Sequence, residues 1–417
     1  MKQARSLPAH ALPYVRCLTS LRNGIEYAAD TLMNLSVDDH SPVQMTLDID
    51  RVKKQHGATF GWDPRINSMW RFGALLPTPA NHAILQNHIV SLGEGATPEV
   101  PLTGIRSIDA MGLCVSIKDE GGLDGNWTNP TGSFKDRGMA MVATMAKLFG
   151  LTRLAVPTQG NAGDSLARYG HHAGMTVAVA MPTDTPEPIK RSVAELVAKT
   201  NGAFELIEVE GTIREAGKAL AGHFQSGWFN CATFQEPGWR IEGKKTLGLE
   251  MAEPKSRNGA WSLPDAIVYP TGGGTGLLGM WKAFDELQAL GLIDQRRPKM
   301  IAVQSTQTQP LVQAIAKNLE DSPDIAPGET CAVGLNVPYG VGHFKVLDIL
   351  RRSGGTAIAI EEQEIQNFTE MLSKQRIFPG PEGVATIAAI EPLFEMGALR
   401  SGDRVVVVNT GAPNKYL

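Results

Sequence analysis

The stretch Asn-Pro-Thr-Gly-Ser-Phe-Lys-Asp-Arg-Gly at residues 129–138 decides how the rest of the chain is interpreted. Its first four residues are typical of a tight turn, because Pro130 fixes one φ angle and Gly132 tolerates the dihedrals that close a bend. Helical spacing of apolar residues then begins, at Met141, Val142, Met145, Leu148 and Phe149. Lys135 therefore lies where a loop enters a helix, at an end that favours anions over cations. This position indicates an amine kept neutral or consumed in an imine, although an exposed lysine on a solvated first turn is the alternative.

A glycine-rich loop far downstream is the partner of this lysine. Pro-Thr-Gly-Gly-Gly-Thr-Gly at residues 270–276 follows an apolar strand-like run, 266–269, and precedes a helix-like stretch, 277–287. Strand, glycine loop and helix together present backbone N–H groups and a helix dipole to a phosphate. The loop lacks the Gly-Lys-Ser/Thr of a P-loop and the distant acidic residue of a dinucleotide site, and a plain strand–helix turn is the alternative. A reactive lysine combined with a phosphate cradle predicts a pyridoxal phosphate site.

Composition limits the remaining classes of function. The chain has 417 residues, enough for more than one core, with 42% hydrophobic and 20% charged residues. Its net charge of −4 gives no reason to expect a nucleic-acid partner. We expect no export signal and no membrane span, because no suitable apolar run is present. The four cysteines, which have no CxxC spacing, predict neither a metal site nor a disulfide framework, and they favour a reducing, cytoplasmic location: Cys17, Cys114, Cys231 and Cys331.

Strand-like and helix-like segments alternate after the lysine loop. We expect strands at 110–118, 153–157, 176–182 and 203–209. We expect helices at 162–174, 188–200 and 212–224. This order predicts a parallel sheet with helices on both faces, and a second series runs through 264–310 and 355–410. The chain should therefore form two α/β domains, with the site in the crevice at the carboxyl ends of the strands.

Several motifs occur in a familiar order between residue 91 and the C-terminus. They are Ser-Leu-Gly-Glu-Gly-Ala-Thr-Pro at 91–98, the lysine motif, Thr-Gln-Gly-Asn-Ala-Gly at 158–163, Trp-Arg-Ile-Glu-Gly-Lys-Lys-Thr at 239–246, the glycine loop and Asn-Thr-Gly at 409–411. On these motifs the chain resembles the fold-type II pyridoxal phosphate enzymes of the tryptophan synthase beta-like superfamily, and within them the threonine synthases.

The resemblance implies an α/β fold with two domains, each an open, mostly parallel twisted sheet flanked by helices, plus an N-terminal extension. Residues 1–88 would be this extension, a ribbon-like remnant. Residues 89–138 and 236–417 would form the large cofactor-binding domain, and 139–235 the small α/β domain. The family also implies a homodimer.

The resemblance also implies a role for each residue that contacts the cofactor. Lys135 would form the imine with the cofactor aldehyde and then move protons on the substrate. The cofactor phosphate would be held by Gly272, Gly273, Gly274, Thr275 and Gly276. Asn161 would hydrogen-bond the phenolic oxygen, and the Thr410 hydroxyl would face the pyridine nitrogen, where it makes the ring a weaker electron sink than a carboxylate would.

A second set of residues would bind the substrate. The α-carboxylate would be gripped by Thr158, Gln159, Gly160 and Ala162, a loop that can also serve as a helix N-cap. Arg240 would reach a substrate phosphate, for which its planar fork is suited. A surface ion pair with Glu242 or Glu236 is the alternative for Arg240. His343, in a glycine-containing loop, is expected to be solvated.

The leading hypothesis is therefore a threonine synthase-like lyase that converts O-phospho-L-homoserine and water to L-threonine and phosphate. Gly273 and Gly276 stand where many threonine synthases have asparagines, and Glu236 precedes Arg240 in place of an expected Asn-Ser pair. These departures keep a second hypothesis open: an ammonia-lyase acting on threonine, serine or diamino acids, or a β-replacement enzyme such as cysteate synthase. A binder of pyridoxal phosphate that has lost its chemistry is the third.

Overall fold

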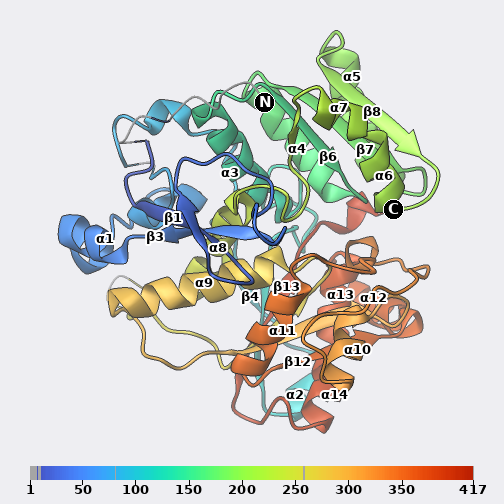
Figure 1. The fold of residues 1–417 in the computed structure, drawn as a ribbon. Helices are drawn as coiled ribbons and strands as arrows, with labels where there is room; N and C mark the ends of the chain where they lie inside the picture. Colours follow the sequence, from blue (N-terminus) through green and yellow to red (C-terminus); the bar gives the residue numbers. More distant parts are fainter. Residues whose placement is uncertain (1–6, 8–10, 80, 257–258, 417) are drawn as a thin grey trace. The chain divides into compact units, whose positions relative to one another are not determined.

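The computed structural model describes residues 7, 11–79, 81–256 and 259–416 (Figure 1). The chain divides into two compact units. The first comprises Met1–Ala96, Lys135–Thr246 and Asp285–Gly291, and the second comprises Thr97–Phe134, Leu247–Phe284 and Leu292–Leu417. Each unit contains a mostly or wholly parallel sheet flanked by helices, which confirms the predicted fold class. The domain boundaries expected from the sequence stay a prediction.

A four-stranded parallel sheet, in the order β8-β7-β6-β9, organises the first unit. Its strands are β6 (Arg153–Pro157), β7 (Thr176–Pro182), β8 (Phe204–Val209) and β9 (Phe229–Asn230). The helices around it are α3 (Lys135–Leu148), α4 (Asn161–His172), α5 (Glu187–Lys199), α6 (Ile213–Ala219) and α7 (Ala221–Gln225). Leu154 and Val156 of β6 share a core with α3 and α4, whereas Ala155 between them packs with α6. Both faces of the sheet are therefore covered, as a parallel sheet requires.

The N-terminal part of the first unit is a small antiparallel sheet in the order β2-β1-β3. It consists of β1 (Val15–Ser20), β2 (Glu26–Ala28) and β3 (Val43–Leu47), and is followed by α1 (Ile49–His56) and the short 3-10 turns η1 (Gly57–Thr59), η2 (Met69–Leu75) and η3 (Gln86–His88). Leu18 and Met45 belong to the same core as Trp239 and the residues of α3. A Cβ at Gly238 would lie 2.8 Å from the Cα of Gln44, so the backbones approach closely there.

The second unit is built on a six-stranded sheet in the order β12-β11-β10-β13-β5-β4, in which only the edge strand β4 is antiparallel. The strands are β4 (Glu99–Pro101), β5 (Cys114–Asp119), β10 (Ala266–Pro270), β11 (Lys299–Ser305), β12 (Thr356–Ile360) and β13 (Arg404–Asn409). The helices and 3-10 turns are α2 (Arg106–Ala110), α10 (Pro310–Ala316), η4 (Val333–Leu335), α11 (His343–Arg352), α12 (Glu362–Lys374), α13 (Pro381–Ala388), α14 (Ile390–Glu395) and η5 (Pro413–Lys415). Two helices have residues in both units, α8 (Trp239–Ala252) and α9 (Thr275–Leu290).

Most predicted elements are present, and two were wrong in detail. The strands at 153–157 and 176–182 agree with β6 and β7. The strand expected at 110–118 begins only at Cys114, because α2 occupies 106–110 and Gly112, at φ +69°, turns the chain. The helix expected at 212–224 is interrupted at Leu220 and forms α6 and α7.

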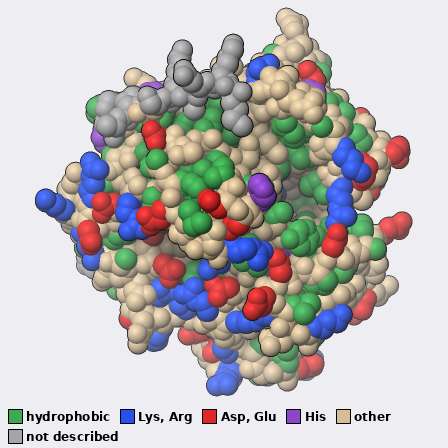
Figure 2. All heavy atoms as spheres, in the orientation of Figure 1, with side chains coloured by type: hydrophobic (Ala, Val, Ile, Leu, Met, Phe, Trp, Pro, Cys, Tyr) green, Lys and Arg blue, Asp and Glu red, His purple; other side chains and the backbone are tan. Residues whose placement is uncertain are grey.

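Charged side chains are spread over the face drawn in Figure 2, where Lys and Arg alternate with Asp and Glu. This interspersed pattern agrees with the small net charge of −4. Among the helices that the structure describes, none has both the length and the apolar character to cross a bilayer.

Candidate active site

The loop that leads to Lys135 is anchored in the second unit. The side-chain amide of Asn129 donates to the backbone oxygen of Glu120, across 2.9 Å, and to its carboxylate, across 3.0 Å. The N–H of Gly132 donates to the Asn129 carbonyl across 2.8 Å and closes the predicted turn. Gly132 has φ +67°, and a Cβ there would lie 2.8 Å from the Trp127 ring, so glycine is needed on both counts.

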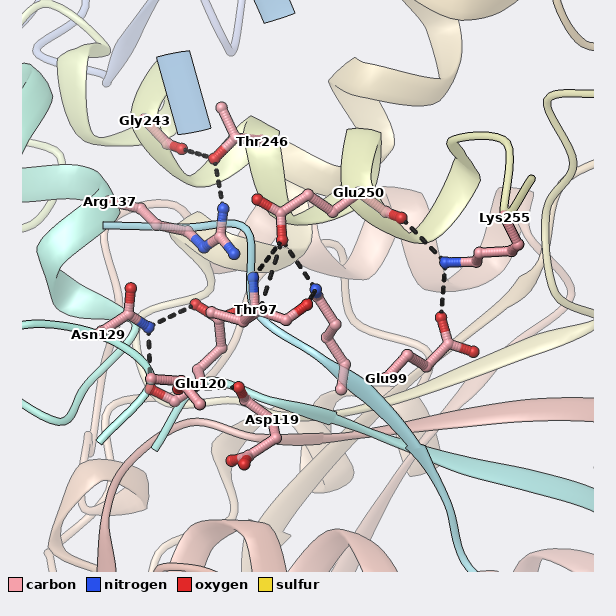
Figure 3. A network of polar contacts seen from close by, with 12 residues as sticks. Thr97, Glu99, Asp119, Glu120, Asn129, Arg137, Gly243, Thr246, Glu250 and Lys255 are labelled. Atoms are coloured by element: carbon pink, nitrogen blue, oxygen red, sulfur yellow. Dashed lines mark hydrogen bonds and ion pairs between the residues drawn. The ribbon is translucent and has the colours of Figure 1, made fainter. Parts of the chain in front are cut away.

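A buried polar network continues from Glu120 to helix α8 (Figure 3). The Glu120 carboxylate accepts the Thr97 hydroxyl, and the Thr97 N–H donates to the Glu250 carboxylate across 3.2 Å. The Lys118 ammonium forms an ion pair with Glu250 across 2.8 Å, with both side chains almost fully buried. Each buried charge therefore has an opposite charge or a hydrogen-bond donor beside it, as burial requires. The network links β5, the start of β4 and the lysine loop into one support.

The end of β13 lies against the last residues of the lysine loop. The N–H of Phe134 donates to the Thr410 carbonyl across 3.1 Å, and the N–H of Ala412 donates to the Gly132 carbonyl across 2.8 Å. Thr410 is 6% exposed. The residue that precedes Lys135 in the chain is thus held by the backbone of the residue predicted to face the cofactor's ring nitrogen.

The glycine loop follows β10 and opens helix α9 at Thr275, as predicted. Added Cβ atoms at Gly272, Gly274 and Gly276 would lie 2.4, 2.3 and 2.0 Å from neighbouring atoms, so these three positions have no room for side chains. Within the described ranges, the backbone N–H groups of Gly272, Gly273 and Gly274 have no hydrogen-bond acceptor. Three such donors at the start of a long helix fit a bound phosphate.

Two aromatic rings place this cradle beside the lysine loop. The Phe134 and Tyr269 rings meet edge to face, with centroids 6.2 Å apart. Tyr269 lies on β10, directly before the glycine loop, and its hydroxyl is the atom that a Cβ on Gly276 would meet. The second unit therefore brings together the glycine loop, Thr410 and the residue before Lys135.

The structure places His343 elsewhere than the sequence analysis predicted and makes it a functional candidate. It is fully buried at the first position of α11, so the expectation of a solvated loop histidine was wrong. Its Nε2 lies 2.8 Å from the Gly272 carbonyl oxygen. Its Nδ1 lies 2.7 Å from the Ser322 hydroxyl and accepts the N–H of Gly340 across 3.2 Å. Because a carbonyl only accepts, Nε2 carries the hydrogen, and burial lowers the pKa of the ring so that it stays neutral.

The first unit holds the other predicted residues. Lys135 is the first residue of α3, and Asn161 is the first residue of the neighbouring helix α4. The two helices are joined near these ends by the Ser165 hydroxyl, which donates to the Asp136 carboxylate across 2.6 Å. The loop before α4, residues 158–160, is closed by the Gly160 N–H, which donates to the Thr158 hydroxyl across 3.0 Å. Lys135 and the loop predicted to bind the substrate carboxylate therefore lie at adjacent helix ends.

Arg240 is buried in the first unit, with 2% of its surface exposed, which excludes the surface ion pair considered from the sequence. Its Nη1 donates to the Cys231 carbonyl across 3.1 Å, and its backbone N–H donates to the Glu236 carboxylate across 3.1 Å. Among the described residues, neither Nε of Arg240 nor Oε1 of Glu236 has a hydrogen-bond partner. Burial raises the pKa of Glu236 to about 7, although the nearby Arg240 charge opposes the shift.

Helices α3 and α8 cross close to Lys135, where Gly138 of α3 meets Gly243 of α8. A Cβ at Gly243 would lie 1.9 Å from the Arg137 carbonyl oxygen, so only glycine fits there. The Arg137 guanidinium donates to the Thr246 hydroxyl across 2.9 Å, which fastens the crossing (Figure 3). Lys244, the next residue on α8, is 1% exposed. Burial, then the charges of Lys135 and Arg240, hold its pKa well below the usual value.

Comparison with known proteins agrees with this geometry. The family model "Pyridoxal-phosphate dependent enzyme" matches residues 90–411, which is more than half of the chain. The chain belongs to this family.

Curated relatives narrow the class of enzyme, and a solved structure supports the fold. The chain is 29% identical over 345 residues to the threonine synthase of Methanocaldococcus jannaschii, covering 82% of this chain and 79% of that protein. It is 29% identical over 349 residues to the threonine synthase of Methanosarcina acetivorans, with the same coverage. Diaminopropionate ammonia lyase from Escherichia coli has a similar fold, with a TM-score of 0.60, 18% identity and coverage of 79% of this chain and 87% of that one. This pyridoxal phosphate enzyme is thus a threonine synthase-like lyase that binds an amino-acid substrate.

Two residues of this enzyme lay outside the sequence prediction. His343 follows a Gly-Val-Gly run that is typical of a solvated loop, and no local signal indicates its bond to Gly272. Lys244 is part of the quoted motif at 239–246, but its neighbour Lys245 gives the pair the appearance of a charged surface. Lys244 directly follows Gly243 in a predicted helix. This neighbour is the signal that could have revealed that Lys244 is buried, because a helical glycine marks close packing.

Proposed function

We propose that the enzyme converts O-phospho-L-homoserine and water to L-threonine and phosphate. The observation that carries the proposal is the buried Arg240 guanidinium, whose Nε has no partner among the described residues. A buried guanidinium with an unused donor is suited to a phosphate ester, which takes two parallel hydrogen bonds from its planar fork. The similarity to curated threonine synthases supports the same substrate.

In this proposal each residue has one task. Pyridoxal phosphate, when bound, supplies an electron sink for the carbanion chemistry. The N–H groups of the loop Gly272, Gly273, Gly274, Thr275 and Gly276 hold its phosphate, and Asn161 and Thr410 orient its ring. Thr158, Gln159, Gly160 and Ala162 hold the substrate carboxylate. The Lys135 amine would hold the cofactor and would move protons between substrate carbons.

A second candidate function rests on Glu236. Its carboxylate is fully buried and accepts the backbone N–H of Arg240. An ionised Glu236 beside Arg240 would compensate the arginine's charge and disfavour a phosphate. That arrangement favours an ammonia-lyase acting on threonine, serine or a diamino acid, or a β-replacement enzyme such as cysteate synthase.

The deciding experiment supplies O-phosphohomoserine to the cofactor-loaded enzyme and measures phosphate and threonine together. We expect both products from the wild type, neither from Lys135→Ala, and a large rise in KM for Arg240→Met. Threonine and serine are supplied in parallel, with keto-acid formation as the readout. Rapid keto-acid formation without phosphate release would replace the leading proposal with the second candidate. A loaded protein that turns over none of these substrates would point to a binder without chemistry.

A homodimer and a cytoplasmic location are part of the same proposal. The homodimer rests on the resemblance to the family. Light scattering of the cofactor-loaded protein tests it, since a molecular mass of one chain would refute the dimer.

A further inference from the structure

The residues that follow β13 lie along the loop that leads to Lys135. Ser133 pairs with Gly411 in an antiparallel β-bridge, and the 3-10 turn η5 comes directly after. This turn brings the side chain of Lys415 back to the loop, where its Nζ donates to the Thr131 carbonyl across 2.6 Å. The C-terminal segment therefore holds the loop by a charged side chain as well as by its backbone.

The ammonium of Lys415 is held in place from two sides. Lys415 is 3% exposed, and a buried ammonium costs free energy unless other groups compensate its charge. Its Nζ lies 5.4 Å from the centroid of the Trp127 ring, within the range of a cation–π interaction. The Trp127 ring is fixed in turn by its Nε1–H, which donates to the side-chain oxygen of Asn414 across 3.1 Å. These contacts direct a charged donor at the Thr131 carbonyl.

The carbonyl that accepts this bond belongs to the peptide between Thr131 and Gly132. The N–H of the same peptide donates to the Asn129 carbonyl across 2.8 Å. Gly132 has φ +67°, and a glycine permits more than one orientation of the peptide beside it. Bonds to both the carbonyl and the N–H select one orientation. Because only two residues separate this peptide from Lys135, its orientation controls the path of the backbone into Lys135.

We propose that Lys415 is a positioning residue for Lys135, because its ammonium holds the Thr131–Gly132 peptide in the orientation that Lys135 needs to bond pyridoxal phosphate. The inference rests on the proposed role of Lys135 and is independent of the amino-acid substrate. Lys415 acts only through the loop. Its removal should therefore weaken the bond between Lys135 and the cofactor, and should leave the contacts to the cofactor's phosphate and ring as they are.

The test compares two compounds that share the phosphate and the ring. Pyridoxal phosphate carries an aldehyde whose oxygen a lysine amine can displace as water, whereas pyridoxamine phosphate carries an amine there and cannot bond a lysine. Fluorescence titration of the full-length apoprotein measures both Kd values, and their ratio reports the bond to Lys135. We expect Lys415→Met to reduce the preference for pyridoxal phosphate roughly tenfold, as the loss of a charge-assisted hydrogen bond would, and to leave the Kd of pyridoxamine phosphate unchanged.

Three further variants separate positioning from a general loss of structure. Lys415→Arg keeps a charged donor and should retain most of the preference. Lys374→Met removes an exposed lysine of α12 and should change neither Kd. Trp127→Leu replaces an exposed ring beside the Lys415 ammonium and should lower the preference by a smaller factor than Lys415→Met does.

Two results for Lys415→Met overturn the inference. One is a preference equal to that of the wild type. The other is an equal weakening of both compounds, which a merely structural role would produce. Binding of pyridoxamine phosphate shows whether the variant is folded. If Lys415→Met does not fold, Trp127→Leu decides, and a preference equal to that of the wild type in Trp127→Leu overturns the inference.

Lys135→Ala separates this inference from the proposed role of Lys135. If Lys135→Ala loses the preference while Lys415→Met keeps it, the positioning role of Lys415 is refuted and the role of Lys135 stands. If Lys135→Ala keeps the preference of the wild type, the bond to Lys135 is refuted and the inference with it. Neither result depends on whether the enzyme forms threonine from O-phosphohomoserine.

Discussion

The Nε2–H of His343 donates to the backbone carbonyl of Gly272 across 2.8 Å, and so fixes one end of the glycine loop from helix α11. Orientation of this peptide decides where the following N–H groups point. We predict that His343→Ala weakens binding of pyridoxal phosphate roughly tenfold, because one buried hydrogen bond of about 1 kcal/mol or more is lost. Fluorescence titration of the apoprotein with cofactor measures the change.

The neighbouring contact provides the control for His343. Ser322→Ala removes the hydroxyl 2.7 Å from Nδ1 but leaves the bond from Nε2 to Gly272 in place. We expect a smaller effect on cofactor affinity for Ser322→Ala than for His343→Ala. Equal cofactor affinities in wild type and His343→Ala would show that the loop keeps its shape unaided.

The crossing of α3 and α8 tolerates no side chain at Gly243. A Cβ there would lie 1.9 Å from the Arg137 carbonyl oxygen, which is backbone and cannot move aside. Gly243→Ala should therefore lower the free energy of unfolding by about 3 kcal/mol or more, as overpacked sites do. Gly217→Ala in α6 is the matched control, because nothing lies within 4 Å of its Cβ position and alanine favours helix. Urea unfolding of both variants tests the contrast, and equal stabilities would contradict it.

Much of the fold follows from local sequence. The strands β6, β7 and β13 are nearly continuous apolar runs bounded by loop residues, and such runs belong to parallel sheets covered on both faces. Lys135 at the first position of α3 follows from the turn chemistry of Asn129–Gly132 and the helical spacing after it. These features depend on neighbours within a few residues, which a single sequence displays directly.

The parts that sequence could not predict depend on distant partners. His343 reads as a loop residue until α11 and the glycine loop are placed together. For Arg240 the sequence leaves a surface ion pair open beside the predicted phosphate contact, and only the crossing with α3 shows that the side chain is buried. Neither burial has a local cause, because each follows from contacts with segments many residues away.

Removing one partner of the Lys118–Glu250 ion pair should destabilise the protein strongly, whereas replacing both partners with apolar residues should not. Lys118→Met removes the ammonium that pairs with the buried Glu250 carboxylate, so we expect a loss of about 3–5 kcal/mol in the free energy of unfolding. The double variant Lys118→Met/Glu250→Leu should recover most of that loss. Lys374→Met in the exposed pair with Glu370 should leave stability essentially unchanged. Additive losses in the double variant, measured by urea unfolding, would refute this account.

The buried Glu236 carboxyl should make stability depend on pH. Burial raises its pKa from 4.5 to about 7, so in this interval the folded protein binds more protons than the unfolded chain. The free energy of unfolding must then decrease as pH rises from about 4.5 to about 7, by about 3 kcal/mol from this group. The Glu236→Gln side chain cannot ionise, so the free energy of unfolding of this variant lacks the pH-dependent contribution of Glu236. The difference in unfolding free energy, Glu236→Gln minus wild type, should therefore grow by that amount between the two pH values in urea titrations. A difference that stays constant, or shrinks, would mean that Glu236 is ionised throughout and is stabilised by Arg240 more than burial destabilises it.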